Sequence, residues 1–380
     1  MDFQHLKDKI DSSPAFVIDT DAVKKNLATL ESIRQQSGCK ILYSIKALPL
    51  SCVLQPIQAF VDGFSVSSLF EAQLATEILK DQGSLHLTTP GLRPDEWSTL
   101  STLLSHISFN SLTQYQHFLA LNSTLTNIGL RVNPKLSFVN DLRYDPCRPH
   151  SKLGVDIDIL WQANILKDLK GLHIHNVFSA TDYSPVIKTI EKLRHYFGKQ
   201  LAHLDWLNLG GGYLFNEIKH HADFINLITA LKQDYDLNIF IEPGKALVDS
   251  AGYLLTTVLD CFISDGKTVA ILDTSVNHHP EVFEYQKKLE LHEHQCTAKH
   301  SIILAGSSCL SGDIFGEYQF TQPLCVGDKL VFKNVGAYSL IKANRFNGYN
   351  LPSIYSYQNS QLKKEKQDHY ADYRQQWYLN

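Results

Sequence analysis

The sequence has 380 residues, 44% of them hydrophobic and 19% charged, and 35 Lys and Arg against 39 Asp and Glu give a formal net charge of -4. This composition is typical of a globular chain long enough for one large or two medium domains. The near balance of charge argues against nucleic acid and anionic membranes as partners, and no apolar run is long enough to span a bilayer. Residues 1–13 are polar and lack the apolar segment of a signal peptide, so we expect a cytoplasmic protein.

The cysteines indicate reduced thiols. There are seven of them, an odd number, and none forms a Cys-x-x-Cys pair, which argues against a disulfide framework and a structural zinc site. The stretch HEHQC, residues 292–296, alternates possible metal ligands, but no second cluster stands at finger or helical spacing. We therefore expect a solvated hairpin there, and no metal.

Up to about residue 250, short β-branched runs alternate with helical patterns. The helical patterns include residues 69–80 and residues 186–199, the latter with Gly198 as a stop signal. Such alternation predicts right-handed crossovers and a parallel sheet, and eight units close most naturally into a (β/α)8 TIM-type barrel. The eight expected strands are residues 41–46, 63–68, 85–89, 106–111, 128–134, 171–177, 206–212 and 238–244.

After about residue 250 the pattern becomes mainly β. Residues 268–275, 301–306 and 329–339 are expected strands separated by turns, with little helix between them. The charged and aromatic tail, residues 362–378, is expected to be a surface helix or strand that closes this part. We therefore expect a barrel domain over residues 14–248 and a mainly β C-terminal domain over residues 249–380, completed by residues 1–13.

Polar residues and glycines stand where the barrel strands end, which is where barrels of this kind carry their chemistry. Lys46 could form a Schiff base, His175 could lie over a planar ring and Glu242 could hold a pyridinium proton. The glycines would let backbone N–H groups approach a phosphate. Together these are the requirements of pyridoxal phosphate. The full set is Lys46, Ser67, Asn110, Asn133, His175, Gly210, Gly211, Gly212 and Glu242.

Each of these signals is weak alone. A lysine that closes a strand is more often a solvated edge residue, and a single histidine is more often part of the core. The three glycines could form only a tight turn, and without a GxGxxG motif a dinucleotide site is not indicated. Glu242-Pro243-Gly244 is more specific, because it places a carboxylate at the barrel mouth before a sharp turn.

Particular segments carry a family resemblance over nearly the whole chain. They are YSIKA (43–47), LNLGGGY (207–213), IEPGKA (241–246), ILDTSVNHHPEVFE (271–284), AGSSCLSGDIFGEY (305–318) and GAYSLIKANRFNGYNLPSI (336–354). The chain resembles the fold-type III pyridoxal-phosphate enzymes, which include alanine racemase and the ornithine, arginine and diaminopimelate decarboxylases. Within that group it is most similar to the carboxynorspermidine (carboxyspermidine) decarboxylases.

The resemblance implies roles for residues in both parts of the chain. Lys46 would carry the Schiff base, His175 would stack on the cofactor ring and Glu242 would pair with the pyridine nitrogen. The phosphate would be bound around Gly211, Gly212, Gly244 and Tyr338.

The resemblance also implies decarboxylation of a small amino-acid substrate in a homodimer with shared active sites. Cys309 would enter from the partner subunit and protonate the carbanion. Asp313 would contact a distal amine of the substrate, and His279 would also contact the substrate.

Two positions depart from the polyamine enzymes. Where relatives continue from His-Asn to a Cys-Glu pair, this chain has Val177-Phe178-Ser179, and where they have EPGE it has Lys245. Lys152 also stands where relatives often have arginine. Because a polyamine substrate needs anionic partners, three interpretations stay open. They are a carboxynorspermidine-type decarboxylase, a decarboxylase of the same lineage for a siderophore or peptide-antibiotic precursor, and a non-enzymatic homologue that binds a partner subunit. A racemase is disfavoured, because the CLSGD loop offers cysteine and aspartate rather than a second proton carrier such as tyrosine.

Overall fold

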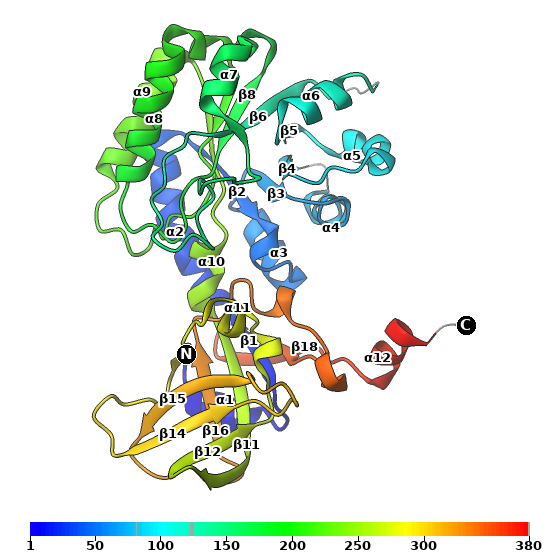
Figure 1. The fold of residues 1–380 in the computed structure, drawn as a ribbon, viewed down its shortest axis with the longest axis vertical. Coiled ribbons are helices and arrows are strands. Elements are labelled where there is room, and N and C mark those ends of the chain that lie inside the picture. Colours follow the sequence, from blue (N-terminus) through cyan, green and yellow to red (C-terminus); the bar gives the residue numbers. More distant parts are fainter. Residues whose placement is uncertain (81, 122–124, 379–380) are drawn as a thin grey trace. The chain divides into compact units, whose positions relative to one another are not determined.

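A computed structural model describes residues 1–80, 82–121 and 125–378. The chain forms two compact units (Figure 1). One, the barrel unit, is Lys25–Ala246, and the other, the β unit, consists of Met1–Lys24 together with Leu247–Asn380. Among the described helices, none is both long and apolar enough to cross a membrane.

The barrel unit contains eight parallel strands that pair in chain order and close through β5–β6 and β10–β2. The short strand β7 (Val155–Asp156) pairs with the end of β6 outside this ring. All eight expected strands are present, and the predicted TIM-type barrel is confirmed. The strands are β2 Lys40–Ser44, β3 Gly63–Val66, β4 Ser84–Thr89, β5 His106–Phe109, β6 Asn127–Asn133, β8 Gly171–Ile174, β9 Trp206–Asn208 and β10 Asn238–Ile241.

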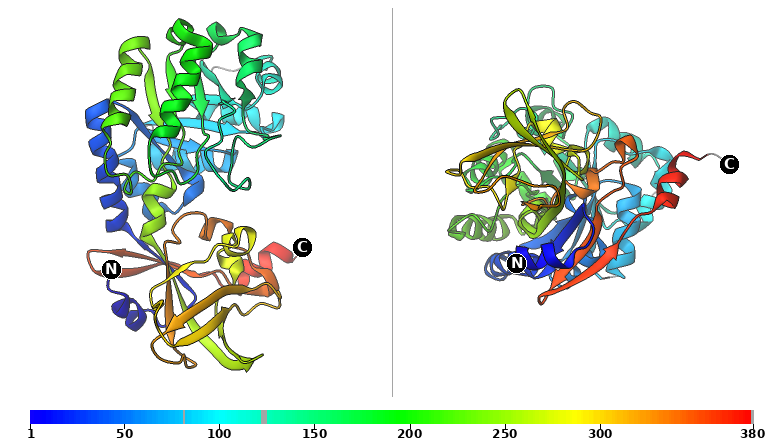
Figure 2. Two further views of the ribbon diagram at one scale, coloured as in Figure 1. Left: turned by 60° about the vertical axis from the view of Figure 1, so that its left-hand side comes forward. Right: turned by 90° about the horizontal axis from the view of Figure 1, so that it is seen from below.

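Helices surround these strands (Figures 1 and 2). Helix α8 shows how the sequence forms such a helix. Its buried residues recur at helical spacing (Val186, Ile190, Leu193 and Phe197), and Gly198 ends it with a φ of 50°. The helices are α2 Thr20–Ser37, α3 Ser51–Gln58, α4 Leu69–Leu79, α5 Trp97–Leu103, α6 Leu112–Leu119, α7 Ile157–Ala163, α8 Ser184–Phe197, α9 Ala222–Tyr235 and α10 Lys245–Val248.

The first strand ends earlier than predicted. β2 stops at Ser44, whose N–H donates to the carbonyl of Pro243, and Lys46 lies in a 3-10 turn, Ile45–Ala47. The Leu48 N–H closes this turn on the Ile45 carbonyl at 3.1 Å. Lys46 therefore stands just beyond the strand rather than on its last residue.

The amino ends of the strands form a packed aromatic floor. The rings of His86 and His106 stack with centroids 3.9 Å apart, and both lie against Trp206 and Phe240. Gly171 makes this possible, because a Cβ there would lie 2.0 Å from the Trp206 ring. The floor closes this end, so the chemistry of the barrel is confined to the other end.

The β unit is built from both ends of the chain. Strand β1 (Ala15–Asp19) lies between β11 (Gly252–Ser264), to which it is antiparallel, and β17 (Ser353–Gln358), to which it is parallel. Leu6, Val17, Leu255 and Val331 belong to one buried cluster. The remaining elements are α1 Phe3–Lys9, β12 Lys267–Leu272, α11 Glu281–Tyr285, β13 Glu290–Leu291, β14 His300–Ala305, β15 Ile314–Phe320, β16 Lys329–Lys333, β18 Gln361–Lys366 and α12 Tyr370–Trp377.

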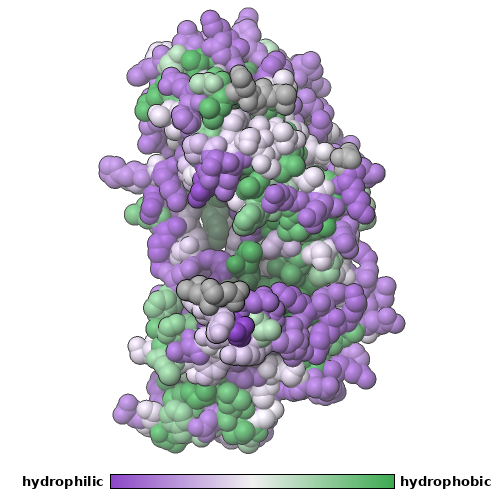
Figure 3. Space-filling view, turned by 90° about the vertical axis from the view of Figure 1, so that its right-hand side faces the viewer, coloured by the Kyte–Doolittle hydropathy of each residue, from purple (hydrophilic) through white to green (hydrophobic). Residues whose placement is uncertain are grey.

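The predicted mainly β C-terminal part is confirmed. Its tail forms both a strand, β18, and a helix, α12. Helix α12 has no buried residue, and Trp377 is 66% exposed. Figure 3 shows one face of the molecule, on which hydrophilic residues predominate and apolar residues form smaller patches.

Candidate active site

A buried carboxylate lies where β10 ends. Glu242 is 7% exposed, accepts a hydrogen bond of 2.8 Å from Asn208 Nδ2, and lies 3.3 Å from His173 Nε2. Burial alone raises the pKa of Glu242, but His173, Lys46 and the Asn208 amide outweigh it and hold that pKa far below its usual range. Burial lowers the pKa of His173, so a neutral imidazole donates Nε2–H to an ionised Glu242.

Lys46 faces the same end of the barrel. Its side chain is exposed, and desolvation of its amine by the surrounding protein lowers the pKa of Lys46. The Glu242 carboxylate raises that pKa and the Arg131 guanidinium lowers it further. The lowered pKa increases the share of neutral, nucleophilic amine near neutral pH.

The imidazole of His175 is fixed by the glycine loop. The Gly211 N–H donates to His175 Nδ1 at 3.0 Å, and Arg131 Nη2 donates to the His175 carbonyl at 3.2 Å. Burial, followed by the charge of Lys46, lowers the pKa of His175 well below its usual value. The ring is therefore neutral, with its proton on Nε2, and its plane is held in one orientation.

The glycines after β9 have no room for side chains. A Cβ on Gly211 would lie 2.2 Å from the Glu242 carbonyl oxygen, and one on Gly212, whose φ is +94°, would lie 2.4 Å from the Val177 carbonyl oxygen. Gly244 is less crowded but still tight, with a Cβ position 3.0 Å from Ala47 Cβ. Bare backbone thus lines this edge of the barrel mouth, as a phosphate cradle requires.

These barrel residues fit pyridoxal phosphate. Lys46 offers an amine for the aldehyde, Glu242 an anion for the ring nitrogen, His175 a fixed ring face, and the glycines a cradle for the phosphate.

The two departures from the polyamine enzymes contact each other. Lys245 Nζ lies 3.3 Å from Ser179 Oγ and 5.4 Å from the centroid of the Phe178 ring. Phe178 stacks on Tyr144, with ring centroids 4.4 Å apart. A cation and an aromatic pair therefore occupy this part of the barrel mouth.

Three residues that shape the barrel site were not predicted. Arg131, His173 and Asn208 lie within strands β6, β8 and β9, and all three are buried. The available signal was a polar residue inside an otherwise apolar strand. Such a residue needs a buried partner, and Glu242 and the His175 backbone supply it.

The predicted Cys309 and Asp313 lie in the β unit. Cys309 is exposed, and its N–H donates to Asn347 Oδ1 at 2.8 Å. Asp313 is 3% exposed and accepts hydrogen bonds from the N–H groups of Val276 and Ser308 at 2.8 and 3.0 Å. Its carboxylate thus organises the loop that carries Cys309.

His279 and Tyr338 also lie in the β unit. His279 is fully buried, and its Nδ1 is hydrogen-bonded to Ser339 Oγ. Tyr338, half-buried, precedes Ser339 and has a φ of +59°, the left-handed conformation. The structure therefore places the predicted residues in two groups: Lys46, His175, Gly211, Gly212, Glu242 and Gly244 in the barrel unit, and His279, Cys309, Asp313 and Tyr338 in the β unit.

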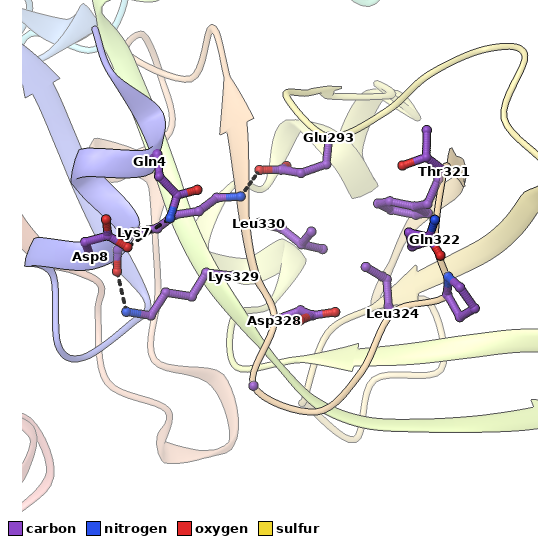
Figure 4. Close-up of a pocket in the computed structure, with 13 residues that line it drawn as sticks. Gln4, Lys7, Asp8, Glu293, Thr321, Gln322, Leu324, Asp328, Lys329 and Leu330 are labelled. Carbon is purple, nitrogen blue, oxygen red and sulfur yellow. Dashed lines mark hydrogen bonds and ion pairs between the residues drawn. The ribbon is translucent and has the colours of Figure 1, made fainter.

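A separate pocket of about 510 Å³ lies in the β unit and contains none of the predicted residues (Figure 4). An ion pair of 2.6 Å joins Lys7 to Glu293 across it, and Lys329 Nζ donates to the carbonyls of Lys7 and Ile10. These charges are satisfied within the protein. In the HEHQC stretch, His294 Nδ1 accepts from the Gln319 N–H, and among the described residues no three His, Cys, Asp or Glu side chains group as metal ligands.

The family described as "Pyridoxal-dependent decarboxylase, C-terminal sheet domain" matches residues 15–336 of the chain. The chain is 34% identical to a carboxyaminopropylagmatine decarboxylase of Synechocystis sp. over 348 residues, which cover 90% of this chain and 89% of that protein. It is 32% identical to a carboxynorspermidine/carboxyspermidine decarboxylase of Herminiimonas arsenicoxydans, with 90% of this chain and 93% of that protein covered.

A solved structure is similar over the whole fold. It is that of carboxynorspermidine decarboxylase from Campylobacter jejuni, complexed with norspermidine, with a TM-score of 0.87 and 27% identity. The match covers 96% of this chain and 100% of that chain.

Proposed function

The chain belongs to the pyridoxal-dependent decarboxylases, and we propose that it removes the α-carboxylate of carboxynorspermidine or carboxyspermidine to release the polyamine. The observation that carries this proposal is an ionised, buried Glu242 at the same barrel end as a lysine of lowered pKa. Relatives at 32% and 30% identity that bear these substrate names support the choice of substrate. The family consists of decarboxylases, so the chain is an enzyme and the non-enzymatic interpretation is set aside.

Pyridoxal phosphate, once bound, supplies a conjugated ring that accepts the electron pair left on the α-carbon when carbon dioxide departs. Lys46 would bind the cofactor aldehyde through its neutral amine. Glu242 would hold a proton on the ring nitrogen, and Asn208 and His173 keep its carboxylate ionised. His175, fixed through Gly211, would cover one face of the ring and exclude water there.

Cys309 would then give its thiol proton to the α-carbon. We place this thiol at the active site of the partner subunit in a homodimer, with Tyr338 at the cofactor phosphate and Asp313 and His279 towards the substrate. The exposure of Cys309 supports this part of the proposal, since a thiol that acts on a partner must be accessible. All seven cysteines carry free thiols, which supports a reducing compartment, and we propose the cytoplasm.

A carboxylated agmatine derivative is the second candidate substrate. One relative at 34% identity carries such a name, and agmatine ends in a planar guanidinium. The stacked Tyr144 and Phe178 favour this candidate, because guanidinium groups stack on aromatic faces.

Absorbance spectra of the wild type and Lys46→Ala test the cofactor site, and carbon dioxide release from carboxynorspermidine, carboxyspermidine and carboxyaminopropylagmatine tests the substrate. We expect a cofactor band that the variant loses, with gas from one of the first two compounds. Gas from the third alone would favour the second candidate. A band without gas from any of them would remove both and favour the siderophore-type or peptide-antibiotic-type substrate.

A further inference from the structure

We propose that Asn347 is a positioning residue for Cys309, because it holds the cysteine's peptide group and so fixes where the thiol proton is delivered. This inference rests on the proposed role of Cys309 as proton donor. It concerns contacts within the β unit alone.

The base of the Cys309 loop is rigid. Asp313 accepts hydrogen bonds from the Val276 N–H and from both the N–H and the hydroxyl of Ser308. Gly306 packs against the same carboxylate, where a Cβ would lie 2.1 Å from Asp313 Oδ1. Buried hydrogen bonds to a carboxylate are among the stronger ones, so the loop is fixed as far as Ser308.

Cys309 extends beyond this base and is held from the other side. Its N–H donates to Asn347 Oδ1 at 2.8 Å, and Tyr349 Oη donates to the Ser307 carbonyl at 2.6 Å. Asn347, in the Phe346–Gly348 turn, and Tyr349, the residue after that turn, therefore hold Cys309 and the segment just before it. Only the first of these bonds acts on the Cys309 peptide itself.

The conformation of Asn347 explains why asparagine suits this position. Its φ and ψ are 57° and 14°, in the left-handed region that Asn and Gly adopt most easily, and Gly348 follows with a φ of 76°. Glycine would keep this turn but lose the acceptor oxygen. Asparagine supplies both.

In the proton step, the Cys309 S–H bond breaks and a C–H bond forms at the α-carbon, whose electron pair remains after carbon dioxide leaves. The resulting thiolate regains a proton from water. The rate depends on how often the thiol occupies the right position, whereas substrate binding does not. Because this step follows the irreversible loss of carbon dioxide, release of the Cys309 peptide should lower kcat and KM together and leave kcat/KM unchanged.

The test compares Asn347→Gly, Asn347→Asp and the wild type. Removal of one neutral hydrogen bond should speed hydrogen exchange at the Cys309 amide roughly two- to tenfold and lower kcat by a similar factor. Asn347→Asp keeps an acceptor oxygen and tolerates the left-handed conformation. Its exchange rate at the Cys309 amide and its kcat should therefore match those of the wild type. Asn359→Gly, at another left-handed asparagine with a φ of 49°, is the matched control.

Unchanged exchange in Asn347→Gly would overturn the proposal, as would faster exchange with unchanged kcat. If Asn347→Gly folds poorly, Tyr349→Phe removes only a hydroxyl and should give a smaller fall in kcat with the same kcat/KM. Cys309→Ala removes the thiol itself. If turnover were unaffected in this variant, the proposal would also be overturned, because Cys309 would not be the proton donor. In that case the absorbance spectrum and the release of carbon dioxide would still test the proposed decarboxylation independently.

Discussion

At the scale of single residues, the role proposed for Glu242 depends on its negative charge. Glu242→Gln keeps the shape and the Asn208 contact but cannot be an anion, so under the proposed function the cofactor ring nitrogen would lose its partner. We expect kcat to fall by about a hundredfold or more, the order seen when one preorganised electrostatic contact is lost. The Glu281→Gln variant, at a buried glutamate of the β unit, should keep normal turnover. Comparable rates in the two variants would contradict this role for Glu242.

Some residues of the barrel site could be predicted from the sequence, and others could not. Lys46, His175 and Glu242 follow recognisable strand ends, so their shared location follows from the barrel topology. Arg131 and Asn208 lie inside strands, and their purpose depends on partners distant in the sequence. Such contacts arise only when neighbouring strands pair in the barrel, and they could not be derived from local patterns.

At the scale of elements, the glycine loop after β9 offers a sharp test. Gly211→Ala would force a Cβ to 2.2 Å from the Glu242 carbonyl oxygen, so the loop must shift. We expect the purified variant to retain much less pyridoxal phosphate, measured by absorbance after release into alkali. Gly91→Ala is the control, because a Cβ there meets nothing within 4 Å. Equal cofactor content in both variants would count against the phosphate cradle.

The barrel floor, formed where the strands begin, predicts that the free energy of unfolding depends on pH through His106. Burial lowers the pKa of His106 to about 4, so the unfolded chain binds a proton between about pH 6.5 and pH 4 that the folded chain does not. Stability is therefore complete above pH 6.5 and falls as pH drops, by up to about 3 kcal/mol from this residue.

His106→Phe keeps a ring against Trp206 and Phe240 but cannot titrate. Urea midpoints followed by tryptophan fluorescence at pH 7 and pH 4.5 should differ less for this variant than for the wild type. An identical loss of stability in both proteins would show that His106 does not carry the effect.

At the scale of the whole molecule, the proposed dimer can be tested by mixing inactive subunits. If Cys309 acts in the partner's site, Lys46→Ala and Cys309→Ala subunits mixed through mild denaturation should regain about a quarter of wild-type activity, because each hybrid dimer contains one intact site. Each variant refolded alone serves as the baseline. No recovery despite hybrid formation, followed by native mass spectrometry, would indicate that each subunit supplies its own cysteine.

The barrel and the mainly β part could be predicted because period, length and breakers are local signals. The position of β1 could not. Its sequence, AFVID, is an apolar run typical of a strand, but nothing in it indicates which strands it pairs with. Its neighbours β11 and β17 begin more than 200 residues later. Residues 1–13 were expected in the C-terminal domain, but residues 15–19 were expected in the barrel domain, and only long-range pairing assigns them to the β unit.

The place of β1 has a consequence for synthesis on the ribosome. Residues 25–246 leave the exit tunnel as a complete set of barrel strands, whereas β1 emerges first and must wait for β11 and then β17. Throughout that interval its backbone N–H and C=O groups lack their final partners, which makes this apolar segment a natural target for chaperones and for wrong pairing. Strand β1 is thus made long before β11 and β17, and it can be paired on both sides only after both have been made.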